Sequence, residues 1–365
     1  MARISIRIKS ILKCTKFGTY LRRSMWNKGL VNVTIIDKAI DRYMGQVSQQ
    51  EKESIRNDIL EMAKKYRFSA EEYFCYHFKD RSEEERKTFI SDMNRVDFCE
   101  SLNKSRNLAK FDDKMLTYKI FGKFYKREIC YVSKDKDFEK FDLFFKKLGK
   151  VIIKPVLGTC GKGIQIADIA EKKDLDAFYK QLKKDYCGKK KDGFIAEELI
   201  VQTPEMAQFH PSSLNTIRVA TVKFDEGVEV IAAFFRTGRG GNIVDNAGAG
   251  GVFGTIDVAT GIIDAVGDEY GNNYEVHPDT GIKMVGFEIP CWKEAVETAK
   301  ELATVVKGNR YAGWDLALTD KGWVMIEGNS RGQFVWQMPR QKGFFKETNQ
   351  ILKRLGMPEM KKTSI

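Results

Sequence analysis

The chain of 365 residues lacks the cysteine spacing of a disulfide framework or a zinc site. Its cysteines number seven, which is odd, and no two of them form a C-x-x-C pair. This scattered pattern predicts a protein of the reducing cytoplasm. Histidine is also scarce, with three residues, which argues against a histidine-rich metal site. The cysteines are Cys14, Cys75, Cys99, Cys130, Cys160, Cys187 and Cys291.

Long apolar runs are missing as well. No run reaches the roughly 18–20 residues that a membrane-spanning helix needs. The first residues show no secretory signal with an apolar core and a small-residue cleavage site. Internal repeats and low-complexity tracts are absent too. We therefore expect a cytoplasmic protein without a membrane span.

Acidic residues are missing from residues 1–30, which contain eight basic residues. Five aliphatic residues, between Ile4 and Leu12, are interleaved with the first of these. One interpretation is a basic amphipathic segment at the inner face of an anionic membrane, where each basic residue adds about 1 kcal/mol. The other, which we favour, is a solvated helix whose apolar residues pack on the protein. The basic residues are Arg3, Arg7, Lys9, Lys13, Lys16, Arg22, Arg23 and Lys28.

The overall composition is that of a globular protein with a large core. Apolar residues make up 42% and charged residues 31%, and the length predicts two or three structural units. The formal net charge of +12 suits an anionic partner, which could be a nucleotide phosphate, a nucleic acid or a membrane surface. The basic residues do not alternate with aromatic ones as in a known nucleic-acid module, so we disfavour nucleic acid.

Residues 35–105 have the spacing of amphipathic helices. Ser69 begins a capping-box pattern, and we expect a helix from there through Phe78. Ser82 begins another such pattern, followed by Phe89 and Ile90, which we expect on a third helix. The aromatic residues are best explained as core packing, and this region shows no catalytic constellation.

Residues 313–329 predict a β-hairpin that reverses at Asp320-Lys321-Gly322. Strand alternation places Glu327 and Asn329 on one face, and the hairpin can bring Asp315 opposite them. Two carboxylates and an amide oxygen form the kind of site that Mg²⁺ occupies when it also holds nucleotide phosphates. The alternative is a hairpin that ends in solvated acids.

A lysine inside an apolar strand is the second notable feature. Lys154 lies within residues 151–155, where its charge is costly unless an anion matches it. The glycine-rich residues 158–163 follow, and a strand comes next. Because glycine lets backbone N–H groups approach phosphate oxygens, this strand–loop–strand unit suits a lid over phosphates. Its spacing is not that of a P-loop, and a plain hairpin turn is the alternative.

Further strands are expected at residues 194–200, 213–222 and 228–236. Arg218 lies in the middle of one of them and also needs an anionic partner. Residues 238–251 form a long glycine-rich loop, which is either a surface connection or a substrate loop. A helix over residues 292–306 precedes the hairpin.

Taken together, these features resemble the ATP-grasp superfamily over roughly residues 106–340. The whole chain is most similar to the sugar-transfer associated ATP-grasp family. The matching motifs are Leu214-Asn215-Thr216-Ile217-Arg218, Asp245-Asn246 with Gly250-Gly251, His277-Pro278, Gly313-Trp314-Asp315 and Ile326-Glu327-Gly328-Asn329.

The resemblance implies an α+β fold in which two lobes grip ATP, with a helical region before them. Residues 1–105 would form the basic N-terminal segment and this helical region. Residues 106–192 would form the N-terminal lobe with the phosphate lid, and residues 193–355 the C-terminal lobe with the metal site.

The resemblance also assigns a role to individual residues. The lysines Lys114 and Lys154 would bind ATP phosphates, and Asp315, Glu327 and Asn329 would bind one or two Mg²⁺ ions. Lys154 would also act in catalysis together with Arg218, which would steady the transferred phosphoryl group. The remaining assignments are a lid of Gly158, Thr159, Gly161, Lys162 and Gly163, an adenine contact at Glu197, Glu198 and Leu199, a ribose contact at Glu205, and a substrate loop with Asp245, Asn246, Gly250, Gly251 and His277.

The chemistry implied is ATP-dependent carboxylate activation. A carboxylate forms an acylphosphate, and an amine then displaces phosphate to give an amide. By analogy, the partners would be a small carboxylate and an amine, with a glycan or glycolipid precursor of cell-surface polysaccharide as a candidate acceptor. D-alanine–D-alanine ligases carry an arginine where this chain has Trp314, so their dipeptide substrate is not carried over.

Two other functions stay open at the level of sequence. The first is a phosphotransferase that uses the same nucleotide site on a sugar hydroxyl. The second is a non-catalytic protein that binds nucleotides or nucleic acid, which the net charge of +12 suggests. A site with lysines, an arginine and oxygen ligands, without a Ser-His-Asp constellation, favours phosphoryl transfer through positioning and charge neutralisation.

Overall fold

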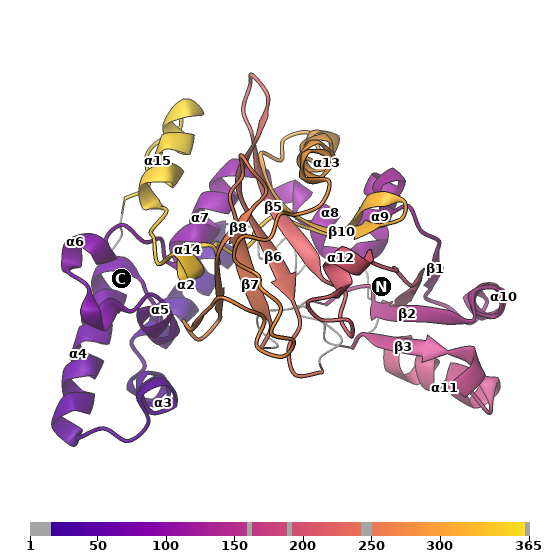
Figure 1. Ribbon diagram of the computed structural model, residues 1–365, viewed down its shortest axis with the longest axis horizontal. Helices are drawn as coiled ribbons and strands as arrows, with labels where there is room; N and C mark the ends of the chain where they lie inside the picture. Colours follow the sequence, from indigo (N-terminus) through magenta and orange to yellow (C-terminus); the bar gives the residue numbers. More distant parts are fainter. Residues whose placement is uncertain (1–15, 159–162, 188–191, 242–249, 362–365) are drawn as a thin grey trace.

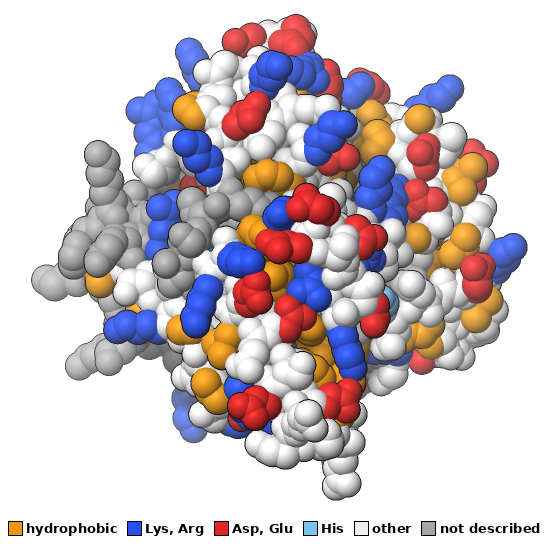
Figure 2. Space-filling model, turned by 90° about the vertical axis from the view of Figure 1, so that its left-hand side faces the viewer, with side chains coloured by type: hydrophobic (Ala, Val, Ile, Leu, Met, Phe, Trp, Pro, Cys, Tyr) orange, Lys and Arg blue, Asp and Glu red, His pale blue; other side chains and the backbone are white. Residues whose placement is uncertain are grey.

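The computed structural model describes residues 16–158, 163–187, 192–241 and 250–361. From left to right, Figure 1 shows a group of helices, a large central sheet and a smaller sheet with its own helices. In the described part of the chain, no helix has both the length and the hydrophobicity of a membrane-spanning helix. Figure 2 views the helical end, where basic and acidic side chains lie side by side with apolar ones between them.

The N-terminal part is helical, as expected. Its helices begin at side-chain caps, and the two capping boxes at Ser69 and Ser82 are confirmed. Buried aromatic and aliphatic side chains from α3 to residue 89 pack into one cluster. The elements are α2 (Lys16–Leu30), α3 (Val33–Met44), α4 (Gln49–Tyr66), α5 (Ala70–Cys75), η1 (Phe78–Asp80), α6 (Glu83–Arg86), α7 (Asp92–Leu102) and η2 (Ser105–Asn107).

Two helix lengths expected here are wrong. The helix that begins after Ser69 ends at Cys75, and the helix after Ser82 ends at Arg86. His77 has a left-handed backbone (φ 51°), which stops the first helix before Phe78. The chain then turns so that Phe78 and Phe89 pack edge to face, with ring centroids 5.4 Å apart. Aromatic packing therefore overrides the local helical pattern.

The smaller sheet has four antiparallel strands in the order β1-β4-β2-β3. Aromatic side chains of α10 and α11 cover one face and form a core with Val151, Ile153 and Phe194. The strands are β1 (Ile129–Val132), β2 (Lys150–Pro155), β3 (Gln165–Asp168) and β4 (Phe194–Glu198), and the helical elements that accompany them are α10 (Asp137–Leu148), η3 (Ile169–Glu171) and α11 (Leu175–Tyr186). The helices α8 (Ala109–Asp112) and α9 (Lys114–Tyr125), which precede β1, pack against β11 of the large sheet.

The large sheet has seven strands in the order β11-β10-β5-β6-β7-β8-β9. Helix α13 packs against β5 and β6 on one face. Phe98 of α7 and the residues Phe334 and Trp336 cover the other face. The elements are α12 (Pro204–Ala207), β5 (Thr216–Lys223), β6 (Val228–Thr237), β7 (Val252–Ile256), β8 (Ile263–Asp268), β9 (Asn273–Tyr274), α13 (Trp292–Val305), β10 (Tyr311–Thr319), β11 (Gly322–Asn329), α14 (Gln337–Arg340) and α15 (Phe345–Arg354).

The expected hairpin is confirmed as β10 and β11. Thr319 pairs with Gly322, so Asp320 and Lys321 form a two-residue turn. Along the same pair of strands, Asp315 lies directly opposite Glu327, and the register shifts after Asp315. The hairpin forms one edge of the large sheet and turns these two carboxylates toward each other.

Candidate active site

A cavity of about 320 Å³ lies where the small sheet meets the strand ends of the large sheet. This volume is in the range of small-molecule sites, roughly 300–1,000 Å³. Isoleucine side chains from β1, β2 and β4 make one wall apolar, and Ile326 of β11 faces the same space. The charged side chains in its lining are Lys114, Lys154, Glu197, Arg218, Arg236, Asp315, Glu327 and Arg331.

Lys154 of β2 finds its anionic partner in Glu197 of β4. The Lys154 Nζ lies 3.1 Å from Glu197 Oε2, and Arg127 donates two hydrogen bonds to the same oxygen at 2.7 and 2.8 Å. Burial raises the pKa of Glu197, but the charges of Arg127 and Lys154 outweigh it and lower that pKa to about 2. Burial lowers the pKa of Lys154, while Glu197 opposes this change. The three residues form one buried cationic group with a surplus positive charge.

Arg218 of β5 finds its partner in Asp315, its cross-strand neighbour on β10. Arg218 Nη2 donates to Asp315 Oδ2 at 2.7 Å, and Arg236 Nη1 of β6 donates to the same oxygen at 2.7 Å. Burial raises the pKa of Asp315, but the two guanidinium groups more than compensate and lower it. The strand order β10-β5-β6 explains why these three side chains meet on one face of the sheet.

Glu327 and Asn329 complete the candidate metal ligands at the end of β11. Burial and the nearby charge of Asp315 raise the pKa of Glu327. A divalent cation beside the two carboxylates would relieve this repulsion. Within the described part of the chain, the amide nitrogen of Asn329 is buried without a hydrogen-bond partner. Because a side-chain amide can turn over and present its oxygen, Asp315, Glu327 and Asn329 fit a hard, oxygen-bound ion such as Mg²⁺.

The lid residues lie partly outside the described residues. Lys114, at the start of α9, donates from its Nζ to the carbonyl oxygen of Gly158 at 2.9 Å. Gly163 has a positive φ of 75°, and its carbonyl oxygen accepts a hydrogen bond from Tyr186. Lys114 therefore connects the cavity to the base of the expected lid. Three expected lid residues, Thr159, Gly161 and Lys162, lie outside the described residues.

The expected nucleotide-base contacts are divided between two cavities. Glu197 lines the main cavity, whereas Glu198 and Leu199 line a neighbouring cavity of about 440 Å³. Tyr125 lines both. Glu205 lies on α12 with an exposed side chain, and it is not in the lining of either cavity. Its ribose contact stays a prediction.

The expected substrate loop is described only at its edges. Asp245 and Asn246 lie outside the described residues, and Gly250 and Gly251 immediately precede β7. His277 is buried, and its Nε2 lies 2.9 Å from the carbonyl oxygen of Gly238 at the start of the loop. Burial lowers the pKa of His277. Its position suits a support for the loop, and it does not line the cavity.

Three arginines of this region are not in the sequence-based prediction. Arg236 carries the same signal as Arg218, because it ends the apolar run of β6, and it could have been found by the same argument. Arg127 lies between α9 and β1 and carries no such signal. Arg331 lines the cavity just after β11, and its Nε lies 3.0 Å from Glu100 Oε1 of α7.

Comparison with known families agrees with this geometry. The model of the family described as sugar-transfer associated ATP-grasp matches residues 93–353. The chain belongs to this family. The expected α+β class and ATP-grasp fold are thereby confirmed. The sugar-transfer associated ATP-grasp match begins within α7, so the last N-terminal helix belongs to the matched region.

Several solved structures resemble this chain at low sequence identity. They include the ATP-grasp ligase PsnB complexed with minimal precursor, Mg and ADP (15% identity, 70% of this chain and 62% of that chain, TM-score 0.42). Another is N5-carboxyaminoimidazole synthase from Aspergillus clavatus in complex with ADP and 5-aminoimidazole ribonucleotide (10% identity, 76% of this chain and 60% of that chain, TM-score 0.41). A third is an L-amino acid ligase from Bacillus licheniformis (12% identity, 62% of this chain and 41% of that chain, TM-score 0.35). This chain thus spans 41–62% of their lengths. A search of curated proteins returned no match.

Proposed function

We propose that the protein is an ATP- and Mg²⁺-dependent carboxylate–amine ligase. The observation that carries this proposal is one cavity with two charged groups in its lining. Lys154, held by Glu197, comes from the small sheet, and Asp315, held by Arg218 and Arg236, comes from the large sheet. Membership of an ATP-grasp family supports ATP as the nucleotide.

In the proposed reaction, the chain's own residues mainly position charge. The apolar isoleucine wall suits the adenine ring, while Lys154 and Lys114 suit the phosphates. The substrate carboxylate attacks the γ-phosphorus, ADP leaves, and an acylphosphate forms. An amine then attacks the carbonyl carbon, and phosphate leaves as the amide forms and the nitrogen loses a proton. Such transfer depends on positioning and electrostatics.

Two guanidinium groups, of Arg218 and Arg236, lie against Asp315 in the wall of the cavity. In a buried setting, their positive charge would stabilise the negative charge that is carried by the transferred phosphoryl group. Mg²⁺, when bound by Asp315, Glu327 and Asn329, would neutralise phosphate charge. Arg218 and Arg236 would keep Asp315 ionised and correctly oriented in this role.

We further propose that the enzyme joins an amino acid to a sugar, a sugar acid or a small peptide during synthesis of a cell-surface polysaccharide. The description of the family supports this acceptor class. Trp314 bears on it as well, because its ring is buried against Phe111 and Phe121 and its Nε1 donates to Thr221 at 2.9 Å. At this position the chain uses its side chain for packing, so the acceptor must be bound by other residues.

The test is ADP release with a panel of amino acids and sugar acids as carboxylates, and of amino sugars, amino acids and small peptides as amines. We expect turnover with at least one pair, and loss by about 100-fold or more in Lys154→Ala, Asp315→Ala and Glu327→Ala. Asp225→Asn, in the exposed turn between β5 and β6, is the matched control and should keep wild-type turnover. Full turnover in the Asp315 and Glu327 variants would overturn the site.

The mass of the product separates the ligase from a sugar kinase at the same site. An amide product, lighter by one water than the sum of the two substrates, supports the ligase. A phosphoester, which carries the γ-phosphoryl group, would show instead a phosphotransferase. Calorimetry with ATP–Mg²⁺ and with an oligonucleotide addresses the non-catalytic alternative, because heat from the oligonucleotide alone would contradict a nucleotide site.

A further inference from the structure

Exposed apolar side chains are concentrated on α2 and the first turn of α3. Of the eleven large apolar side chains that are exposed in the described residues, five lie between residues 21 and 35. Met25 is the most exposed of these five, at 73%. A soluble surface usually carries such residues singly, so a cluster of this density indicates a contact with something apolar. The five are Leu21, Met25, Trp26, Val33 and Ile35.

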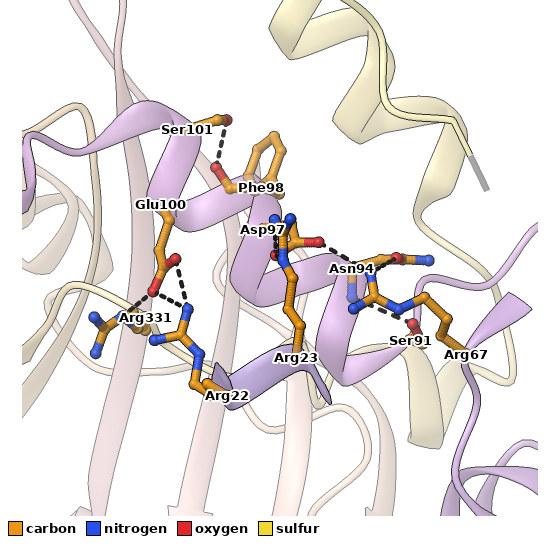
Figure 3. A network of polar contacts seen from close by, with 10 residues as sticks. All are labelled: Arg22, Arg23, Arg67, Ser91, Asn94, Asp97, Phe98, Glu100, Ser101 and Arg331. Carbon is orange, nitrogen blue, oxygen red and sulfur yellow. Dashed lines mark hydrogen bonds and ion pairs between the residues drawn. The ribbon is translucent and has the colours of Figure 1, made fainter. Parts of the chain in front are cut away.

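Two arginines of helix α2 reach across to α7, as Figure 3 shows. Arg22 Nη2 lies 2.8 Å from Glu100 Oε2, and Arg23 Nη2 lies 2.7 Å from Asp97 Oδ1, so two arginines connect α2 to α7. An amphipathic helix on a soluble protein ordinarily packs its apolar side on the core and exposes its charges. Here Arg22 and Arg23 form ion pairs with α7, while Met25 of the same helix is exposed to solvent.

An apolar cavity of about 390 Å³ lies behind these helices. Trp26 and Leu30 of α2 and Ile35 of α3 form one side, and Met93 and Phe334 contribute to its lining. Trp26 and Ile35 are themselves partly exposed, at 37% and 44%, so they lie where the cavity meets the surface. The exposed cluster and the cavity are therefore parts of one continuous apolar feature.

Most of the buried polar groups in this lining bond within the protein, while Glu71 and Gln333 of the lining are exposed. Glu72 accepts hydrogen bonds from the backbone of Ser69 and Asp92, at 2.8 and 2.6 Å, and burial raises its pKa to about 8. Asp92 also pairs with Arg95 at 2.8 Å. The amide of Gln337 is bonded to the backbone at residue 90. The cavity thus suits a ligand that brings no hydrogen-bonding groups, such as a hydrocarbon chain.

The charge of the N-terminal residues indicates which kind of lipid surface would supply such a hydrocarbon chain. Residues 1–30 contain eight basic residues and no acidic one. Arg22 and Arg23 are paired with Glu100 and Asp97 of α7, whereas Lys28 is exposed beside Met25 on α2. We propose that α2 and the start of α3 form a lipid-binding surface that rests on an anionic bilayer and admits a hydrocarbon chain into the cavity behind Trp26. Apolar insertion and attraction to anionic lipid together account for both features.

The location has a consequence for the reaction. Gln333 lines this cavity and also the candidate active site, because the segment after β11 runs between the two. A molecule that is anchored in the bilayer and enters this cavity would therefore be separated from the candidate active site by the segment that follows β11. Lipid binding is measured without nucleotide, so its failure would leave the proposed ligase activity untouched.

The first experiment is co-sedimentation of the full chain with phosphatidylglycerol–phosphatidylcholine vesicles, compared with phosphatidylcholine alone. Met25→Glu is the test variant. Leu143→Glu on α10 is the matched control, since its side chain is 71% exposed and the change in charge is identical. We expect binding to anionic vesicles that falls roughly tenfold in Met25→Glu and stays near wild type in Leu143→Glu. Equal loss in both variants, or no binding by the wild type, would overturn the proposal.

The second experiment tests insertion directly with vesicles of brominated phosphatidylglycerol, whose acyl-chain bromine quenches nearby tryptophan. Trp26 is the partly exposed tryptophan, while Trp292, Trp314, Trp323 and Trp336 are buried. We expect quenching in the wild type that disappears in Trp26→Phe. Quenching that persists in Trp26→Phe would refute the assignment of the cavity. A dimer in light scattering without vesicles that Met25→Glu dissociates would show a self-association surface instead, which also overturns the proposal.

Discussion

Glu197→Gln is the substitution that tests the electrostatics of the small sheet most sharply. The Glu197 carboxylate balances the buried charges of Arg127 and Lys154, and its pKa falls from an ordinary value of 4.5 to about 2. At 1.36 kcal/mol per pKa unit, this shift corresponds to about 3 kcal/mol of stability at pH 7. The amide has nearly the same shape but no charge, so we expect the variant to lose roughly this amount.

The measurement is urea unfolding of the ligand-free protein, followed by circular dichroism. Glu198→Gln is the matched control on the neighbouring residue. Its side chain is 32% exposed and lies 3.6 Å from Lys321, so we expect a loss below about 1 kcal/mol. Equal destabilisation by the two substitutions would refute the account of the buried cluster.

The difference in unfolding free energy between the wild type and Glu197→Gln should also depend on pH, in a direction that the pKa of Glu197 defines. Because the folded-state pKa of Glu197 is below its unfolded-state value, its contribution is complete above pH 4.5 and is lost as the pH falls toward about 2. The difference in unfolding free energy between the wild type and Glu197→Gln should therefore shrink over this interval. A difference that grows as the pH falls would contradict the charge assignment.

Three further predictions concern the large sheet. Thr221→Val leaves the buried Trp314 Nε1 without its acceptor and should cost about 1–3 kcal/mol in urea unfolding; an unchanged midpoint would argue against this bond. Gly328→Ala places a Cβ 2.8 Å from the Trp314 ring and should cost about 1–3 kcal/mol in the same assay; an unchanged midpoint would contradict the tight packing of this ring. Arg236→Met removes one charge-assisted hydrogen bond from Asp315 and should lower kcat/KM by roughly ten- to a hundredfold; wild-type kinetics would exclude Arg236 from the site.

The buried cations show what sequence reasoning can reach. Lys154 and Arg218 stand out because each interrupts an apolar strand, and this argument correctly requires an anion for each. Their partners Glu197 and Asp315 are 43 and 97 residues away. The pairing of strands this far apart in the chain depends on how the sheets assemble, and one strand's own pattern does not contain it.

Hairpins and helix caps were more accessible because they are local. The turn between β10 and β11, the opposition of Asp315 and Glu327, and the capping boxes at Ser69 and Ser82 all follow from residues close in the chain. The ends of α5 and α6 did not, because they depend on aromatic rings that meet across the N-terminal cluster. The docking of α2 on α7 also escaped prediction, since it rests on ion pairs between residues far apart in the chain.

Oxygen transfer from the substrate carboxylate tests the central proposal most directly. With the pair that supports turnover, the carboxylate is labelled with ¹⁸O and the released phosphate is analysed by mass spectrometry. Reaction through an acylphosphate predicts that one labelled oxygen per turnover appears in the phosphate and that the amide keeps the other. Phosphate that contains no label, with ADP still released, would contradict carboxylate activation at this site.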